Sequence, residues 1–282
     1  MPKELAEYQK IERSIITTYR KELWSPFVLA VKKYELIQAG DKIAVCISGG
    51  KDSMLLAKLM QELHRHTEVP FELVFLVMDP GYNEENRSRI EENAARLNVP
   101  ITVFESDVFA AADAANAESP CYLCARMRRG HLYAKAKELG CNKIALGHHK
   151  SDVIETTLMG MLYGAQIQGM LPRIKSTNFE GMELIRPMYC ILENDILRWQ
   201  EYNDLKFIAC ACKFTKNLTG GDEDTFSARR KVKALIAELK KENPFVENNI
   251  FQSIHNVQLD TLAEYKQDDQ KHSFLERFLK EE

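Results

Sequence analysis

A glycine-rich turn stands between a strand-like run and a helix-like run near the start of the chain. It follows the β-branched apolar run 43–47 and precedes the helix-forming run 54–60. Backbone N–H groups at such a turn, together with the positive end of a helix dipole, form an anion site, and paired glycines let the backbone approach a phosphate. The glycine spacing is narrower than that of the Walker A motif. The turn therefore predicts a phosphate site formed by Ser48, Gly49, Gly50, Lys51, Asp52 and Ser53.

Asp52 distinguishes this turn from a simple phosphate cradle. A carboxylate beside a polyphosphate repels it unless a divalent cation lies between them, so Asp52 predicts bound Mg²⁺ and a catalytic role. The alternative is a helix start that is capped by Asp or Ser. Capping needs one residue, whereas six stand here in order, so we favour the nucleotide site.

Length and composition describe an ordinary globular protein with one or two domains. The chain has 282 residues, of which 45% are hydrophobic and 28% charged, and its net charge is −3. No apolar run approaches the length of a membrane span, and residues 1–5 lack the apolar core of a signal peptide. We therefore expect a cytoplasmic protein without membrane contact, whose cysteines are reduced thiols. The net charge argues against a globally basic nucleic-acid binder but permits a local basic patch.

Short β-type runs alternate with helical stretches from residue 41 to residue 187, which predicts an α/β fold. We expect strands at 43–47, 73–78, 101–104 and 144–146. We expect helices between and after them at 53–65, 84–97, 107–116, 124–139 and 152–162. Apolar strands alternating with helices point to a doubly wound, Rossmann-like parallel sheet that is covered on both faces.

The rest of the chain is predicted to add helices at both ends of this fold. We divide the chain into an N-terminal helical segment at 1–40, an α/β domain at 41–187 and a mostly helical C-terminal region at 188–282 packed on that domain. The C-terminal helices are expected at 193–204, 227–242 and 257–267, with a break between the last two at Asn243-Pro244.

Polar residues follow each predicted strand and are expected to meet at one edge of the sheet. Ligands of parallel sheets bind beyond the carboxyl ends of the strands. Those ends here carry Ser48, Asp79, Glu105, Gly147 and His148. We expect Asp79, Gly147 and His148 to bind ATP together with the glycine-rich turn, because Gly147 permits close backbone approach.

Two carboxylates follow the fourth strand on one helix face. Asp152 and Glu155 lie three residues apart, and near ATP such a carboxylate can bind magnesium or act as a general base. We expect Asp152 to be catalytic. The alternative is that both carboxylates only favour the helix N-terminus, and His148 and His149 are equally compatible with hydrogen-bonded strand ends.

The clustered cysteines predict a metal or cluster site. Cys121 and Cys124 form a C-x-x-C element at a helix start, and Cys210 and Cys212 form a C-x-C element far downstream. Four thiolates would make a closed site such as structural zinc. Three thiolates on a cubane cluster would leave one iron open for an exogenous ligand such as sulfide.

Basic residues near the cysteines are candidates for RNA contact. Arg126, Arg128 and Arg129 lie about one turn beyond the C-x-x-C pair, and a second basic group downstream includes Arg229 and Lys233. Such clusters are the electrostatic footprint of phosphate binding. The alternative is a solvated helix face, which is at least as common for each charge taken alone.

Several segments carry a family resemblance when they are taken together. They are Ser48–Ser53; Pro120-Cys121-x-x-Cys124; Gly147-His148-His149-x-x-Asp152-x-x-Glu155-Thr156; Met159-x-Met161-Leu162-Tyr163-Gly164 with Gly169-Met170-Leu171-Pro172; and Arg186-Pro187 with Glu193-x-Asp195-Ile196. The first resembles the PP-loop of the ATP pyrophosphatase superfamily. The whole set, across about residues 30–258, resembles the TtcA-like tRNA 2-thiocytidine synthetase family.

The resemblance implies an ATP-dependent sulfur transfer to cytidine in the tRNA anticodon loop. ATP activates the carbonyl at carbon 2 as an adenylate, and a sulfur species then displaces AMP. The resemblance also implies a [4Fe–4S] cluster held by Cys121, Cys124 and Cys210, which presents sulfide on its free iron. The implied partners are tRNA and a sulfur donor such as a cysteine desulfurase or free sulfide, and a homodimer is compatible with it.

Alternative functions use the same motifs differently. Thiolation of another tRNA nucleotide such as uridine is the nearest. An ATP-dependent amidating enzyme would leave the cysteines without a role, and a non-enzymatic nucleotide- or RNA-binding protein with structural zinc would leave Asp152 without one.

The chain departs from the family pattern at two places. Ser151-Asp152 stands where the family usually has two adjacent aspartates, so the surviving carboxylate is Asp152. The third-cysteine segment reads Ala209-Cys210-Ala211-Cys212 in place of Pro-Cys-x-x-Cys, which makes Cys212 an alternative ligand to Cys210.

Single alanine variants of the four clustered cysteines identify the ligands. We expect anaerobically reconstituted Cys121→Ala, Cys124→Ala and Cys210→Ala to lose the cluster, and Cys212→Ala to keep it, as measured by iron and acid-labile sulfide per chain. Loss in Cys212→Ala with retention in Cys210→Ala would exchange the third ligand, and loss in all four would mean a closed site. Bound zinc without labile sulfide would contradict the iron–sulfur prediction.

Overall fold

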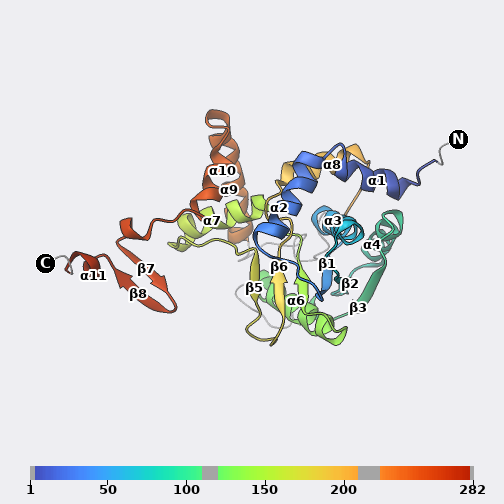
Figure 1. Ribbon diagram of the computed structural model, residues 1–282, viewed down its shortest axis with the longest axis horizontal. Coiled ribbons are helices and arrows are strands. Elements are labelled where there is room, and N and C mark those ends of the chain that lie inside the picture. The colour runs from blue at the N-terminus through green and yellow to red at the C-terminus, as the bar shows by residue number, and fades with distance from the viewer. Residues whose placement is uncertain (1–3, 110–119, 209–222, 280–282) are drawn as a thin grey trace.

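The computed structural model describes residues 4–109, 120–208 and 223–279, and its centre is a six-stranded sheet with helices on both faces (Figure 1). Before the sheet come α1 (Glu7–Ile16), the π-helix η1 (Arg20–Trp24) and α2 (Ser25–Lys33). The α/β part contains β1 (Lys42–Ile47), α3 (Lys51–His66), β2 (Glu72–Asp79), α4 (Glu84–Arg96), β3 (Ile101–Glu105), α6 (Pro120–Glu138), β4 (Lys143–Ala145), α7 (Lys150–Gly164), β5 (Arg173–Lys175) and β6 (Glu183–Ile185). The remaining elements are α8 (Glu193–Tyr202), α9 (Glu223–Glu242), α10 (Val246–Ser253), η3 (Leu259–Thr261), β7 (Glu264–Gln267), β8 (Gln270–Ser273) and α11 (Leu275–Phe278).

The large sheet has the strand order β3-β2-β1-β4-β6-β5 and is parallel except for β5. Its register pairs Ala44 of β1 with Val74 on one side and with Ile144 on the other. The chain runs outward from β1 to β3 in one direction and continues on the opposite side of β1 from β4 onward. The α/β prediction with four parallel strands is therefore confirmed, and the order reverses between β1 and β4, where such sheets bind ligands.

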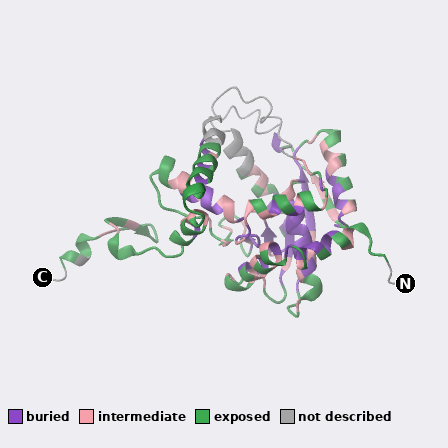
Figure 2. Ribbon diagram, turned by 90° about the horizontal axis from the view of Figure 1, so that it is seen from above, coloured by how far each residue is buried: buried purple, intermediate pink, exposed green. Residues whose placement is uncertain are grey.

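The apolar strands bury side chains on both faces of the sheet. In β1, Ile43, Val45 and Ile47 point into a core shared with α1, α2, α3 and α8, whereas Ala44 and Cys46 point into a second core beneath α6. The burial view shows the same buried centre between exposed outer layers (Figure 2). A strand that is covered on both faces reads as a continuous apolar run, which is why the sequence predicted it correctly.

Most predicted helices are present within a few residues of their expected ends. Helix α6 begins at Pro120, four residues before the start predicted at 124. The helix predicted at 107–116 lies mostly outside the described residues. The sequence missed β5 and β6, which are only three residues long, and also missed α10. Alternation over three residues is too short to be distinctive, and neither β5 nor β6 forms a continuous apolar run like the one at 144–146 that predicted the equally short β4.

The helix predicted at 257–267 is wrong. That segment contains η3 and then β7, which pairs with β8 as an antiparallel hairpin. The hairpin is closed by Asp268 and Asp269, whose φ angles are 49° and 60°. Aspartate tolerates this left-handed conformation, and two such residues in succession form the turn that matches the twist of a hairpin. Residues 264–278 extend away from the body as an exposed arm (Figures 1 and 2).

The C-terminal helices α9 and α10 pack on α7 and α2 rather than on the sheet. Val232 and Ile236 of α9, Phe251 of α10 and Val153 and Ile154 of α7 form a third buried cluster. The helices expected at 193–204 and 227–242 are present as α8 and α9. Within the described residues, no helix is long and apolar enough to cross a membrane.

Candidate nucleotide site

A cavity of about 390 Å³ opens at the carboxyl ends of β1 and β4, where the strand order reverses. We call it the switch-point cavity. It gathers residues from β1, the glycine-rich turn, α6, the β4–α7 connection and α7. The cavity is lined by Cys46, Ile47, Ser48, Asp52, Ser53, Met78, Arg128, Arg129, Leu132, Leu146, Gly147, His148 and Asp152.

Gly49 is required by the shape of the glycine-rich turn. Its φ is +84°, and a Cβ there would lie 2.5 Å from Cγ1 of Ile90 and 2.7 Å from Cδ1 of Ile208. Both contacts are shorter than real Cβ contacts, and both partners belong to segments packed over the turn. Position 49 therefore requires glycine, because neighbouring side chains occupy the space that a Cβ would need.

The hydroxyl of Ser53 holds the turn closed from inside. Its Oγ accepts a hydrogen bond from the Ser48 backbone N–H at 3.1 Å and donates one to the Gly50 carbonyl at 2.9 Å. Gly50 is the N-cap of α3, and within the described residues no side chain caps the helix there. The capping alternative considered for Asp52 therefore fails, and the first-turn N–H groups of α3 have no partner within the helix.

Gly147 allows the second strand end to approach the first turn of α3. A Cβ at Gly147 would lie 3.1 Å from the carbonyl carbon of Asp52 and 3.1 Å from the backbone nitrogen of Ser53. The close backbone approach that was expected at Gly147 is therefore an approach to α3. It brings the β4–α7 connection against the glycine-rich turn, so both lie on the wall of one cavity.

Asp52 has one carboxylate oxygen that is engaged and one that is not. Its Oδ2 lies 3.1 Å from Lys51 Nζ, whereas its Oδ1 is buried without a hydrogen-bond partner among the described residues. Nε2 of His149 lies 3.7 Å from that Oδ1, which is beyond hydrogen-bond distance. A buried carboxylate oxygen without a donor is costly, and its position on the cavity wall suits a bound cation.

His148 presents a neutral imidazole to the cavity. Burial, reinforced by the nearby Arg186 guanidinium, lowers the pKa of His148 to about 4, and burial lowers the pKa of Arg186 to about 10. Nδ1 of His148 and Nε of Arg186 are both buried without a hydrogen-bond partner in the described part of the chain. An uncharged ring at neutral pH can hydrogen-bond a ligand without adding charge to the site.

Asp152 is held between its own helix and α9. Its Oδ2 accepts the His149 backbone N–H at 3.0 Å, and its Oδ1 lies 3.1 Å from Nη1 of Arg229. The same guanidinium nitrogen lies 3.3 Å from the nearly buried Glu155, whose pKa is raised by burial. The helix N-terminus role is therefore real for Asp152, and it coexists with a place on the cavity wall.

Lys51 is bound by two carboxylates at the mouth of the glycine-rich turn. Besides Asp52, its Nζ lies 3.0 Å from Glu193 Oε1, and the other oxygen of Glu193 lies 2.8 Å from Lys233 Nζ. Burial would raise the pKa of Glu193, but these two lysines lower it to about 2. The sequence predicted no role for Glu193 and placed Arg229 and Lys233 among the candidates for RNA contact, since no local pattern shows that α8 and α9 reach this cavity.

Ser151 has a structural partner in α8. Its Oγ accepts the backbone N–H of Glu193 at 3.1 Å, at a helix whose own N-cap residue, Leu192, contributes no side-chain bond. The serine that replaces the first of the family's two aspartates thus caps the helix that carries Glu193.

Asp79 and Glu105 do not line the switch-point cavity. Asp79 Oδ1 accepts backbone N–H groups of Gly81 at 2.9 Å and Tyr82 at 2.7 Å, and its Oδ2 pairs with Arg87 at 2.6 Å. The Tyr82 and Arg87 bonds outweigh burial and lower the pKa of Asp79. Its carboxylate is therefore occupied in shaping the turn after β2, and the ATP contact predicted for it stays a prediction.

Helix α6 connects the cysteine pair to the cavity. Cys121 and Cys124 lie in the first turns of this helix, although their side chains are outside the described part, and Cys210 and Cys212 fall outside the described residues. Of the three predicted RNA-contact arginines, Arg128 and Arg129 line the cavity, and Arg126 is exposed. The buried Cys46 also lines the cavity, but burial raises its pKa to about 12, so its thiol stays protonated.

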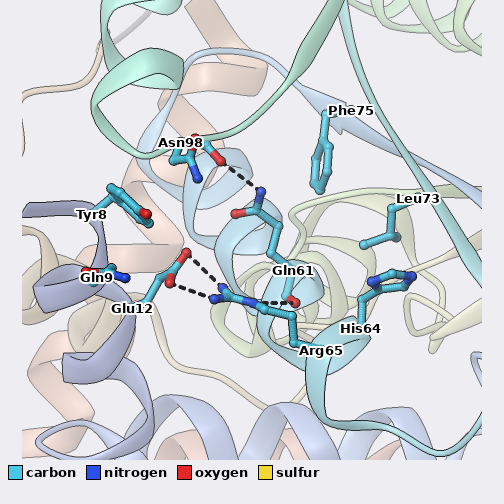
Figure 3. Close-up of a pocket in the computed structure, with 9 residues that line it drawn as sticks. All are labelled: Tyr8, Gln9, Glu12, Gln61, His64, Arg65, Leu73, Phe75 and Asn98. Atoms are coloured by element: carbon cyan, nitrogen blue, oxygen red, sulfur yellow. Dashed lines mark hydrogen bonds and ion pairs between the residues drawn. The ribbon is translucent and has the colours of Figure 1, made fainter. Parts of the chain in front are cut away.

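A second cavity, of about 430 Å³, lies between α1, the end of α3 and β2 (Figure 3). Glu12 and Arg65 meet there as an ion pair at 2.8 Å, and Gln61 donates to the Asn98 carbonyl at 3.0 Å. Glu12 also pairs with the fully buried Lys58. These polar atoms are used in docking α1 onto α3, and the cavity contains none of the residues predicted for the site.

The chain resembles known proteins along most of its length. A family model described as a PP-loop domain matches residues 21–217. A tRNA-cytidine(32) 2-sulfurtransferase of Alkalilimnicola ehrlichii is 35% identical over 240 residues, covering 83% of this chain and 73% of that protein. Its counterpart in Vibrio parahaemolyticus is 31% identical over 267 residues, covering 93% and 83%.

A solved structure shares the fold. It is the U34-tRNA thiolase NcsA of Methanococcus maripaludis with its [4Fe–4S] cluster, which matches with a TM-score of 0.65 at 19% identity and covers 86% of this chain and 80% of that one.

Comparing Gly49→Ala with Gly140→Ala separates the cost of a left-handed backbone conformation from the cost of displacing neighbouring side chains. Gly140 has a φ of +74°, and no atom lies within 4 Å of the position that a Cβ would take, so Gly140→Ala should lose only about 1 kcal/mol of unfolding free energy. Gly49→Ala should lose about 1–3 kcal/mol more, because Ile90 and Ile208 must move. Equilibrium urea unfolding measures both. Equal losses in the two variants would contradict the packing role of Gly49.

Proposed function

This chain belongs to the PP-loop family of the tRNA-cytidine(32) 2-sulfurtransferases, and from that premise we propose that it transfers sulfur to cytidine 32 of tRNA in an ATP-dependent reaction. The observation that carries the proposal is the composition of the switch-point cavity. One cavity joins the glycine-rich turn, Gly147, His148 and Asp152 with two arginines of the helix that also carries the C-x-x-C pair. The cavity thus combines residues suited to a nucleotide with arginines suited to RNA, and these arginines share a helix with the C-x-x-C pair.

The residues of the glycine-rich turn suit the phosphates of ATP. The first-turn N–H groups of α3, which have no partner within the helix, and the Lys51 ammonium provide donors for a pyrophosphate, and Gly49 leaves the backbone uncovered. Charge develops on the leaving pyrophosphate as the cytidine carbonyl is adenylated, and donors already in place stabilise it. His148, neutral and with Nδ1 unpartnered among the described residues, is suited to hydrogen-bond the adenosine or the reacting base.

Asp52 fits a magnesium ion. Its buried Oδ1 lacks a donor among the described residues, and it lies on the wall of the cavity that would receive the phosphates. A magnesium ion on this oxygen would neutralise the charge of ATP and of the departing pyrophosphate.

Asp52→Asn tests this assignment. The amide preserves the shape of the side chain but removes the charge, so we expect folding to be retained and Mg²⁺-dependent ATP binding to weaken by about tenfold or more. Isothermal titration with ATP, with and without Mg²⁺, measures the effect. If the variant bound ATP as the wild type does in both conditions, the magnesium role would be wrong.

The arginines of α6 are suited to guide the tRNA. Arg128 and Arg129 line the cavity, and Arg126 is exposed half a turn earlier on the same helix. Their guanidinium groups can bind phosphates of the anticodon loop, whose base must be splayed out of the stack to enter the cavity.

Described residues that neighbour the clustered cysteines in the sequence lie at the switch-point cavity or at the glycine-rich turn, which supports the cluster proposal. Cys124 precedes Arg128 by four residues, about 6 Å along the helix axis. Ile208, two residues before Cys210, packs over the glycine-rich turn at Gly49. Cys121, Cys124 and Cys210, or Cys212 in place of Cys210, would hold a [4Fe–4S] cluster, which when bound supplies sulfide to the activated base.

We also propose where the sulfur comes from and where the reaction takes place. A cysteine desulfurase or free sulfide would supply the sulfur, and the chain would work in the cytoplasm, either alone or as a homodimer. The division at residues 40 and 187 is likewise proposed, with the α/β part carrying the ATP site.

Product analysis tests the function directly. We expect anaerobically reconstituted protein with ATP, Mg²⁺, sulfide and tRNA to form 2-thiocytidine, identified by mass spectrometry of the digested RNA. Thiouridine as the product would favour the alternative nucleotide. ATP binding with zinc and no thiolated product would favour the non-enzymatic alternative.

Two adjacent variants serve as a matched pair in that assay. Asp152→Asn keeps the hydrogen bond from His149 N–H but loses the charge, and we expect it to slow thiolation by about a hundredfold or more. Ser151→Ala loses only the cap on α8, so we expect a near-normal rate with a stability loss of about 1 kcal/mol. The reverse order of rates would assign the acid–base or metal role to Ser151.

A further inference from the structure

Three charged side chains from three helices form a continuous bridge beside the glycine-rich turn. Lys51 is the first residue of α3, Glu193 is the first residue of α8, and Lys233 lies in the middle of α9. Glu193 uses one oxygen for each lysine, at 3.0 Å to Lys51 and 2.8 Å to Lys233. Lys233 does not line the switch-point cavity, so any effect that it has on a ligand there must be transmitted.

The bridge is partly shielded from solvent, and its inner members are shielded most. The side chains of Lys51, Glu193 and Lys233 are 20%, 25% and 44% exposed. Ion pairs of this kind keep more of their strength than fully exposed ones, although solvent still weakens the outer one.

Glu193 and Lys233 are both anchored to the fold. Ser151 Oγ accepts the backbone N–H of Glu193, and Trp199, further along α8, is fully buried. On α9, Val232 and Ile236 lie on either side of Lys233 and are buried in the cluster that α9 shares with α7 and α10. The carboxylate therefore stays between the two lysines, and the loss of one lysine leaves its whole charge to act on the other.

We propose that Glu193 is a positioning residue for Lys51, and that Lys233 on α9 acts through Glu193 to set how strongly the site binds the phosphates of ATP. The inference rests on the proposed function only in naming ATP as the ligand. While Lys233 shares the carboxylate, Lys51 is held loosely enough to turn toward a phosphate. Without Lys233, Glu193 holds Lys51 more tightly and leaves an uncompensated negative charge beside the phosphates, and both effects oppose ATP binding.

A competing route runs through Glu155. Lys233 also lies 3.5 Å from Glu155, whose other partner, Arg229, contacts Asp152 on the cavity wall. A double-mutant cycle separates the two routes, because a transmitted effect disappears when the transmitting residue is removed.

The test measures ATP affinity of the full-length chain by isothermal titration with Mg²⁺ and without tRNA. We expect Lys233→Met to weaken ATP binding by about threefold to tenfold, and Lys233→Arg to restore it. In a Glu193→Gln background, Lys233→Met should have no further effect. Lys241→Met is the matched control, since Lys241 on the same helix pairs with Glu238 at 2.6 Å but is 71% exposed and remote from the site.

Several outcomes would overturn the inference. Wild-type affinity in Lys233→Met would do so, as would an equal loss with and without Glu193, which would indicate a general effect on α9. A loss that survives Glu193→Gln but vanishes in a Glu155→Gln background would assign the transmission to Glu155. If the wild-type chain did not bind ATP at all, the proposed function would fail before this test is reached.

Discussion

The turn after β1 can close only because residue 49 has no side chain. Ile90 of α4 and Ile208, from widely separated parts of the chain, occupy the space where a Cβ would stand. The bare backbone that suits a phosphate is therefore a consequence of packing from both sides. Gly147, at the end of the neighbouring strand, permits a similar close approach. Because it lacks a Cβ, the β4–α7 connection packs against the first turn of α3. The switch-point cavity depends on these two close approaches.

Charged residues of the site come from helices that the sheet does not require. Arg229 and Lys233 lie on α9, beyond the residues 21–217 that match the PP-loop domain, yet they pair with Asp152, Glu155 and Glu193. An enzyme of this kind must exclude water and hold several like charges close together, and cations from an added helix reduce that repulsion. The C-terminal helices thus contribute charges beside the switch-point cavity, although the glycine-rich turn is complete without them.

Local sequence patterns were sufficient to predict those elements whose conformation is set by residues close to them along the chain. Parallel strands buried on both faces read as apolar runs, and the glycine-rich turn between β1 and α3 predicted both the fold class and the position of the switch-point cavity. The same reasoning failed at 257–267, where two aspartates with positive φ close a hairpin, and at the short strands β5 and β6. The hairpin and the short strands depend on the segments with which they pair, and a local sequence pattern does not reveal those segments.

By itself, the sequence determined the α/β sheet, the glycine-rich turn and the residues Ser48, Asp52, Gly147, His148 and Asp152 that line one cavity. Only the tertiary structure decided which partners the remaining polar side chains have. It assigned Asp79 to a turn, Ser151 to a helix cap and Lys233 to a bridge with Glu193. The physical reason is that a carboxylate or ammonium group is defined by its partner, and these partners lie on segments that only folding brings together.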